Sequence, residues 1–511
     1  MFSLANPLRL LANDVLSCVC MKKASWLTSK DAFYFSKKGE NMTHSSKKKL
    51  TGLSVFAVSM ITITSVDSIR NLPGSATLGA QSVFFFLIAA ILFFIPVGLV
   101  CAELTTMFPE QGGVYLWGKK AFGENFGFLA LWFQFAENLV YYPTLLIFIL
   151  ATLFFPFSQH ASNDPKLMFF AINIVFWGVT LLNFLGLKIS AIFTEIMGLL
   201  GTIIPMLLIC GVGLFWFFSK GDMNQITLNL HTIFPVFDGN TLSITFTSVV
   251  LSLTGMEIAT VYANEVKNPQ KSYPKALLIA TIFILATLTL GSLAISTVVG
   301  PNSSTLNLGI MQFFTEFFAV IHMPFMTVVI AICIVLGGLA SLNNWIIAPL
   351  KGLSSSAKDG FFSARFSREN KNKAPVYMLI SQGIVVSALS SIFIFIPSVN
   401  EGMWLLNILM TQLYMIMYIA IFISFIAVRY KYPTLARPFK VPGGNVGAWI
   451  IAIFGLLASS GTILISFKPD PSVGISSPYM FIIALFIGLF VFSIPALVAI
   501  IVRQKNISNQ L

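Results

Sequence analysis

The run Ser252-Leu253-Thr254-Gly255-Met256-Glu257 interrupts a stretch that is otherwise apolar over about 243–263. Hydroxyl side chains, a glycine and a carboxylate inside a long apolar segment are typical of a membrane helix that is broken near its middle. At such a break, free N–H groups can bind a carboxylate and free C=O groups can bind an ammonium. Ordinary packing of Ser and Thr side chains between helices is the competing interpretation.

The composition indicates that the whole chain is built from such apolar segments. It has 511 residues, of which 56% are hydrophobic and 10% are charged, whereas a soluble globular chain carries about 25% charged residues. This excludes a cytosolic enzyme, a disordered scaffold and a secreted disulfide-rich protein. Twelve segments are long enough to cross a hydrocarbon layer of about 30 Å. They lie at 51–72, 81–106, 126–155, 168–187, 190–218, 243–263, 276–299, 325–350, 375–397, 402–428, 447–467 and 478–502.

The net charge of +12 comes from 31 Lys and Arg residues against 19 Asp and Glu residues. With the N-terminus inside, only four of these basic residues fall in outer connections, namely Arg70, Lys166, Lys220 and Lys468. This asymmetry is the positive-inside pattern, and it explains the basic balance without a nucleic-acid partner. We therefore expect a multi-pass protein of the cell (inner) membrane with both termini in the cytoplasm.

A second hydroxyl-rich segment, Ser59-Met-Ile-Thr62-Ile-Thr64-Ser65, lies in the first expected span. It precedes Ser252–Gly255 by five spans, which is the separation of equivalent positions in two five-helix inverted repeats. Ionisable residues inside spans often mark transport pathways. Glu195 and Glu257 lie deep in their spans, whereas contact with loop water is an equally open interpretation for Asp67 and Glu103.

Four stretches resemble the amino acid–polyamine–organocation transporter superfamily. Thr254-Gly-Met-Glu257-Ile-Ala-Thr-Val-Tyr-Ala-Asn-Glu265-Val-Lys-Asn-Pro269-Gln-Lys-Ser-Tyr-Pro274-Lys-Ala276 is similar to its sixth-helix signature. Pro109-Glu-Gln-Gly112-Gly113-Val-Tyr115-Leu-Trp117 is similar to its loop after helix two. Ile95-Pro96-Val-Gly-Leu-Val-Cys-Ala-Glu103-Leu and Trp345-Ile-Ile-Ala-Pro349-Leu-Lys-Gly352 most resemble the glutamate:GABA antiporter branch. The resemblance covers roughly 51–500.

The resemblance implies an all-α polytopic membrane protein with twelve transmembrane helices and a LeuT-like fold, which consists of two inverted five-helix repeats followed by two peripheral helices. The implied parts are a cytoplasmic tail, two repeats, the peripheral pair and a short cytoplasmic end, at 1–50, 51–218, 243–428, 447–502 and 503–511. Because Met42 could also start the chain, we expect the first 41 residues to be dispensable or misassigned.

The resemblance also places a substrate site on unwound parts of helices one and six, with one aromatic residue from helix eight. These residues are Ser59, Ile61, Thr62, Thr64, Ser252, Leu253, Thr254, Gly255 and Trp345. Tyr142 is expected to form part of the cavity wall, and Glu257 to hold the helix-six break or reach the pocket. Glu195 takes the place of a Lys that substitutes for a sodium ion in many relatives, so it could carry a proton or help bind a cation.

These features predict an amino-acid exchanger of the glutamate/GABA type that works by alternating access, with proton coupling an open possibility. The alternative is an ion-coupled (H⁺ or Na⁺) amino-acid or amine symporter, in which Ser341 and the helix-one hydroxyls would supply Na⁺ ligands. A receptor is disfavoured by the two expected breaks, and an enzyme by the lack of a nucleophile–base set. We expect no cofactor or metal, and a homodimer is left open. Hydroxyls, aromatics and few cations favour a neutral or zwitterionic substrate.

Overall fold

The computed structural model describes residues 54–508, apart from 111, 185–196, 220–223, 236–243, 267, 302–307, parts of 364–374, 396–398 and 469–476. The expected N-terminal tail at 1–50 and Glu195 both lie outside the described residues. The expected division into tail, repeats and peripheral helices stays a prediction.

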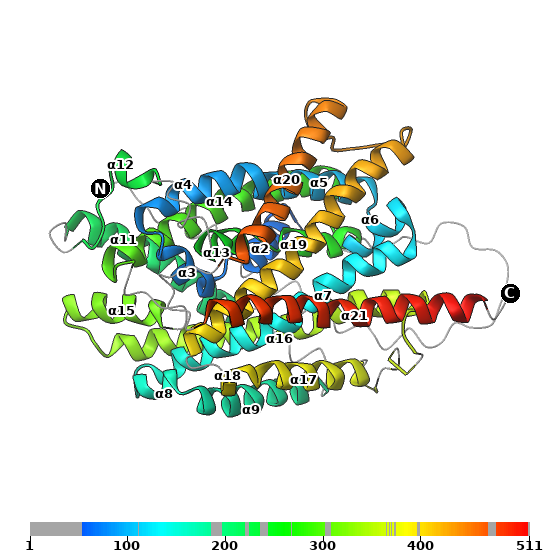
Figure 1. Cartoon of the computed structure of the whole chain (residues 1–511). Coiled ribbons are helices and arrows are strands. Elements are labelled where there is room, and N and C mark those ends of the chain that lie inside the picture. The colour runs from blue at the N-terminus through cyan, green and yellow to red at the C-terminus, as the bar shows by residue number, and fades with distance from the viewer. Residues whose placement is uncertain are drawn as a thin grey trace, which may run out of the picture. The chain divides into compact units, whose positions relative to one another are not determined.

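Ten helices among the described residues are long and apolar enough to cross a membrane, so the chain is a multi-pass membrane protein. They are Gly79–Met107, α7 (Glu124–Phe154), α9 (Pro165–Phe184), Leu200–Ser219, α14 (Pro269–Val298), α16 (Met326–Lys358), Val376–Phe395, α19 (Val399–Lys431), α20 (Gly444–Ser466) and α21 (Pro478–Ser508). They correspond to ten of the twelve expected spans (Figure 1). The other two, at 51–72 and 243–263, are made of shorter pieces. The total of twelve and the five-plus-five repeat stay predictions.

Three of the long helices contain irregular turns or several elements. The span Gly79–Met107 consists of η2 (Gly79–Gln81), α4 (Ser82–Ala89), the π-helical η3 (Ala90–Phe94) and α5 (Ile95–Met107). The widened turn η3 ends two residues before Pro96, whose ring would clash with the carbonyl one turn earlier in a regular helix. A second π-helical turn, η4 (Leu199–Ile203), leads into α11 (Ile204–Ser219). The span Val376–Phe395 consists of α17 (Val376–Ser390) and α18 (Ile392–Phe395).

Short helices fill connections that the hydropathy pattern leaves unassigned. They are α6 (Gly113–Phe122), α8 (Gln159–Asn163), α12 (Leu230–Ile233) and α15 (Gly309–Val320). Phe313, Phe314 and Phe318 of α15 are buried, whereas Thr315 and Glu316 between them are exposed. This helical spacing of apolar residues packs one face of α15 on the protein.

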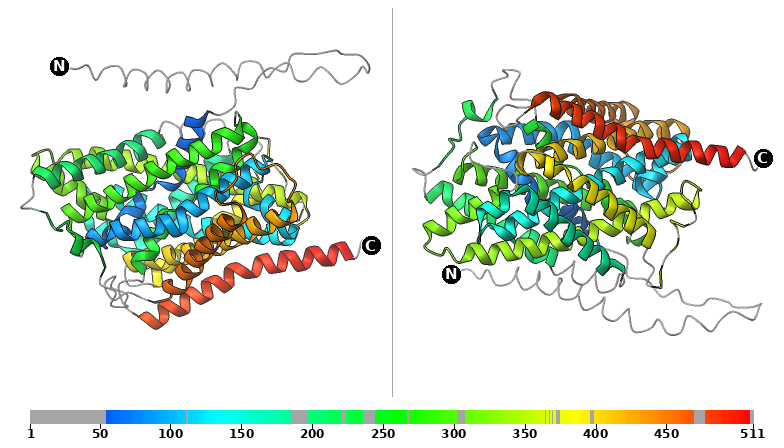
Figure 2. Two further views of the ribbon diagram at one scale, coloured as in Figure 1. Left: turned by 90° about the horizontal axis from the view of Figure 1, so that it is seen from above. Right: turned by 60° about the horizontal axis from the view of Figure 1, so that its bottom comes forward.

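The long helices differ greatly in burial. Within an apolar stretch of 18 residues, 89% of α7 is buried in the protein, but only 17% of the corresponding stretch of α21. Both views in Figure 2 show α21 at the edge of the helix bundle. Where η4 crosses α16, a Cβ atom added to Gly201 would lie 2.4 Å from the Cα of Gly337. Close backbone crossings at paired glycines are typical of membrane helix packing.

Glu103 forms the centre of a buried ion-pair cluster. Its Oε1 and Oε2 accept hydrogen bonds from Nε and Nη2 of Arg429 at 2.9 and 2.5 Å, and Oε2 also accepts from the Val441 backbone N–H at 2.7 Å. The Nε of Arg437 lies 3.4 Å from Oε1. Glu103 is 1% exposed, so it does not contact loop water; it joins α5 to α19 and to the segment before α20.

A second polar cluster joins α6 to the end of α16 and to α21. Asp359, directly after α16, accepts hydrogen bonds from the Tyr115 hydroxyl and from Lys119 Nζ, the latter at 2.9 Å. Arg503 of α21 pairs with Glu124 and donates to the Asp359 backbone carbonyl at 2.7 Å. Burial opposes ionisation of Asp359, but the hydrogen bonds from Tyr115 and Lys119 outweigh it and hold its pKa below the ordinary value.

Candidate functional site

The helix-six segment is interrupted where the sequence indicates. The helix α13 (Ile244–Ser252) ends before Leu253, and the 3₁₀ helix η6 (Met256–Glu265) begins after Gly255. Gly255 has a φ of 106°, a left-handed conformation that costs a residue with a Cβ atom more than it costs glycine. Thr254 donates its hydroxyl to the Leu251 carbonyl at 2.7 Å. Substrate contact by Ser252–Gly255 stays a prediction.

The helix-one segment is also interrupted, but later than expected. The helix α2 (Val55–Val66) runs unbroken through Ser59–Thr64, so the expected position of the break is wrong. The hydroxyls of Thr62 and Thr64 donate to carbonyls one turn earlier, at 2.9 and 2.8 Å. Such bonds let hydroxyl residues stay inside a helix. The interruption lies at Asp67–Ser68, before η1 (Ile69–Asn71) and α3 (Leu72–Ala76).

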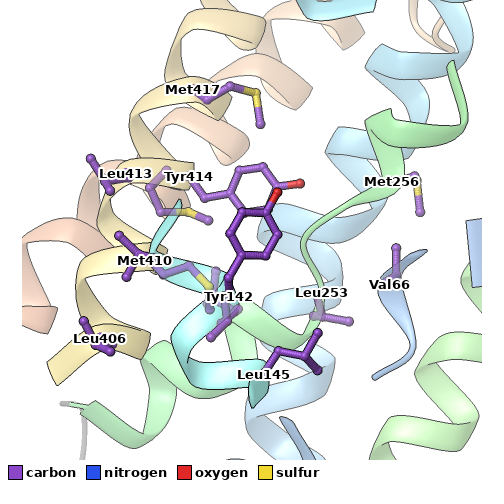
Figure 3. Close-up of a cluster of buried hydrophobic side chains, with 14 of the residues drawn as sticks. Val66, Tyr142, Leu145, Leu253, Met256, Leu406, Met410, Leu413, Tyr414 and Met417 are labelled. Atoms are coloured by element: carbon purple, nitrogen blue, oxygen red, sulfur yellow. The ribbon is translucent and has the colours of Figure 1, made fainter. Parts of the chain in front are cut away.

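The two interruptions lie next to each other. A Cβ atom added to Gly255 would lie 3.2 Å from the carbonyl oxygen of Ser65, the residue two positions before Asp67. Figure 3 shows Val66, Leu253 and Met256 on one side of a buried cluster, facing side chains of α19 on the other. Non-helical backbone from two segments is thus gathered in one place. The N–H groups of Leu253 and Thr254 in it donate to the Val250 and Leu251 carbonyls at 3.0 and 3.1 Å.

Glu257 connects the helix-six interruption to α19 and α7. Its Oε1 accepts hydrogen bonds from Tyr414 at 2.6 Å and from Gln134 at 3.1 Å, and its Oε2 accepts from Tyr418 at 2.5 Å. The Tyr418 oxygen also accepts a hydrogen bond of 2.8 Å from the Gly255 backbone N–H. Tyr418 therefore bridges the interrupted backbone and the Glu257 carboxylate; that Glu257 holds the break stays a prediction.

Arg70 lies in η1, directly after the helix-one interruption. It is 4% exposed, so it is buried in the protein rather than solvated, and its expected place on the outer side stays a prediction. Its Nη1 donates to the Thr144 hydroxyl and, at 3.4 Å, to the Asn407 side-chain oxygen. Its guanidinium carbon lies 4.8 Å from the centre of the Tyr141 ring. Arg70 thus places a cation next to the paired interruptions.

The aromatic residues expected near the site do meet. The Tyr142 hydroxyl donates to the Trp345 backbone carbonyl at 2.8 Å, and the rings of Tyr141 and Trp345 lie 5.6 Å apart. The Tyr141 hydroxyl lies 3.5 Å from the Ser341 hydroxyl. Since Tyr141 also stacks on Arg70, these contacts connect α16 through α7 to the helix-one interruption. Substrate contact by Trp345 stays a prediction.

Two further carboxyl groups are buried close to the interruptions. Asp67 accepts a hydrogen bond from the Thr287 hydroxyl of α14 at 2.8 Å, while its Oδ1 has no hydrogen-bond partner. Asp67 is 4% exposed, so it does not face loop water. Glu137 of α7 is also 4% exposed, and its Oε2 has no partner.

Comparison with known proteins agrees with this architecture. A family model described as amino acid permease matches residues 53–505. The chain belongs to the amino acid permease family. This permease is 41% identical over 454 residues to an uncharacterized transporter of Legionella pneumophila, a match that covers 88% of the chain and 96% of the relative.

Two further relatives of the permease are named as antiporters. A glutamate/gamma-aminobutyrate antiporter of Lactococcus lactis is 29% identical over 447 residues, covering 86% of the chain and 89% of the relative. A probable agmatine/putrescine antiporter of Lactococcus lactis is 25% identical over 373 residues, covering 72% of the chain and 78% of the relative. The relatives are transporters rather than enzymes.

Several residues of this site are not among those expected from the sequence. For Arg70 the signal is the opposite charge of Asp67 three positions earlier, in a stretch with Pro73 and Gly74 that suits an outer loop equally well. For Tyr414 and Tyr418 the spacing of four positions puts both rings on one helix face. That spacing does not reveal which carboxylate they would contact.

Proposed function

We propose that this permease is an amino-acid exchanger that works by alternating access. The observation that supports this most directly is the close approach of Gly255 to the Ser65 carbonyl at the end of α2, which brings the two interruptions together. Interrupted membrane helices expose backbone amides and carbonyls only where they are buried in protein or contact a ligand. A zwitterionic amino acid supplies both complementary groups, a carboxylate and an ammonium.

The glutamate/gamma-aminobutyrate and the probable agmatine/putrescine relatives are both antiporters, which supports exchange rather than one-way transport. Opposite gradients of two substrates would drive the cycle. The positive-inside pattern supports a cytoplasmic location for both termini and, with the bacterial relatives, a place in the cell membrane.

Alternating access requires an element that can adopt two arrangements. The hydrogen bonds from Tyr414 and Tyr418 to Glu257 join the helix-six interruption to α19. When helix six moves relative to α19, these bonds have to break or move together. Glu257 is therefore a positioning residue whose contacts stabilise one arrangement of the interrupted segment.

An ion-coupled symporter is the second candidate, and the observation that favours it is the buried Asp67. A carboxyl group with one unpartnered oxygen at the helix-one interruption could bind a proton or a cation. Ser341 and Glu195 remain further candidates from the sequence.

Counterflow in proteoliposomes separates the two functions. An exchanger takes up labelled amino acid only when unlabelled substrate is inside, and a screen of the twenty amino acids and their decarboxylated products at pH 5 and pH 7 would identify the pair. Uptake that follows an imposed H⁺ or Na⁺ gradient in vesicles without internal substrate would support the symporter instead. Unchanged pH and sodium dependence in Glu195→Gln would remove Glu195 from the coupling mechanism.

A further inference from the structure

We infer that Arg70 is a specificity-determining residue that binds a carboxylate group of the transported molecule. The inference rests on the proposed exchange function and names the group that selects the substrate. It begins with a cation that has no anionic partner. Among the residues that the structure describes, the ion pairs involve Lys119, Arg429, Arg437 and Arg503, and none of them includes Arg70.

The direct contacts of Arg70 are all with neutral groups. The guanidinium donates to a hydroxyl and an amide oxygen through Nη1, its Nε has no hydrogen-bond partner, and its face lies on the Tyr141 ring. Glu137 acts on it electrostatically but lies beyond ion-pair distance. Buried charges are normally paired because transfer out of water is costly. A nearly buried arginine held only by neutral groups is therefore suited to an anion that comes and goes.

The neighbouring groups fix the orientation of the Arg70 guanidinium. Thr144 uses its hydroxyl hydrogen on the Tyr141 carbonyl at 2.8 Å, which leaves its oxygen free to accept from Arg70. Asn407 contributes from α19 and Tyr141 from α7, so two long helices fix the guanidinium. Because arginine presents several N–H donors in a planar fork, Nε and the remaining donors can meet both oxygens of a carboxylate.

The position of Arg70 connects this anion site with the interruptions. Arg70 follows Asp67 by three residues, and the unpartnered oxygens of Asp67 and Glu137 are acceptors for an ammonium group. The site thus offers one cation and two carboxyl groups to a molecule that carries both charges. This revises the expectation of a site with few cations: a carboxylate is the feature that the site selects. It can be the α-carboxylate or a side-chain carboxylate.

The test is counterflow with Arg70→Met and Arg70→Lys, with the exposed Lys166→Met as a control that removes one positive charge elsewhere. The substrates are glutamate, glutamine, γ-aminobutyrate and putrescine. Loss of a hydrogen-bonded charge partner should raise KM for carboxylate substrates by about tenfold to a hundredfold in Arg70→Met. The same change should leave putrescine unaffected or improve it. Arg70→Lys should fall between the two, because lysine keeps the charge but not the fork.

The substrate panel identifies the carboxylate. A loss confined to glutamate and glutamine assigns Arg70 to the α-carboxylate, whereas a loss confined to glutamate and γ-aminobutyrate assigns it to the side-chain carboxylate. An equal change for all four substrates, or no change, overturns the inference. If both Arg70 variants fail to fold while Lys166→Met folds, Arg70 is structural and the inference fails. Absence of counterflow in the wild-type protein would instead refute the proposed exchange.

Discussion

Tyr418→Phe tests how the helix-six interruption is held. The Tyr418 hydroxyl takes part in two hydrogen bonds, one donated to Glu257 at 2.5 Å and one accepted from the Gly255 N–H at 2.8 Å. Removing it deletes a bond to a carboxylate, worth about 1.5–3 kcal/mol. It also leaves a buried N–H unpaired, which costs about 1–3 kcal/mol. Allowing for partial relaxation, we expect a loss of about 3 kcal/mol in stability.

Tyr414→Phe is the matched control. Tyr414 lies one turn earlier on α19 and donates to the same carboxylate at 2.6 Å, but it has no bond to the interrupted backbone. Its removal should cost about 2 kcal/mol, the value of one hydrogen bond to a carboxylate. The structure therefore predicts an order of effects rather than only a loss.

Two measurements on the purified variants test whether Tyr418→Phe has the larger effect. The midpoint of thermal unfolding in detergent should fall more for Tyr418→Phe than for Tyr414→Phe. The exchange rate in proteoliposomes should change more in Tyr418→Phe than in Tyr414→Phe, because Tyr418 also loses its bond to the interrupted backbone and the balance between the two arrangements shifts further. Equal effects, or a larger effect of Tyr414→Phe in both assays, would refute the bridging role of Tyr418.

Three further predictions concern stability. Gly255→Ala should lower the unfolding midpoint, because its φ of 106° and the Ser65 carbonyl at 3.2 Å leave little room for a Cβ atom; the strain is about 1–2 kcal/mol. Gly178→Ala, with no atom within 4 Å of the added Cβ, should be neutral or slightly stabilising, and an equal loss in both would argue against strain. Glu103→Gln should cost about 3–5 kcal/mol, because it leaves the partner guanidinium buried without its counter-charge; an unchanged midpoint would contradict this. Wild type should be more stable than Asp359→Asn, and this difference should have its full size well above pH 3.8, the ordinary Asp pKa. It should vanish as the pH falls below that value, because the folded state stabilises the ionised carboxylate and so lowers its pKa. A difference that grows on acidification would contradict this.

The sequence predicts the long helices well because hydrophobic length is a direct consequence of bilayer thickness. The span over Gly79–Met107 and the interruption at Gly255 both follow from local composition. In the second case a glycine stands where a left-handed conformation is needed, so the local pattern and the tertiary structure agree.

The helix-one interruption is harder to predict because Ser and Thr occur both at helix breaks and inside continuous helices, where their hydroxyls bond to the backbone. Thr62 and Thr64 satisfy their hydroxyls within α2 and leave the helix intact. The break occurs at Asp67, whose carboxylate is paired by Thr287, a residue 220 positions away. A partner so distant in sequence leaves no local pattern.

The same reasoning explains why the sequence leaves contact with loop water open for Glu103 and favours an outer connection for Arg70. A charged residue close to the end of an apolar segment suits either a loop or a buried pair. The partners of Glu103 lie on α19 and before α20, and those of Arg70 lie on α7 and α19. Only the packing of these helices decides between the two environments.

The central claim is that paired helix interruptions hold the transported amino acid. The most direct measurement is a cryo-electron microscopy map of the protein in lipid nanodiscs, with the amino acid that counterflow identifies present at saturation. We predict ligand density between the backbone of Ser65–Asp67 and that of Leu253–Gly255. Density for the amino acid elsewhere in the bundle, with both interruptions free of ligand, would contradict the claim.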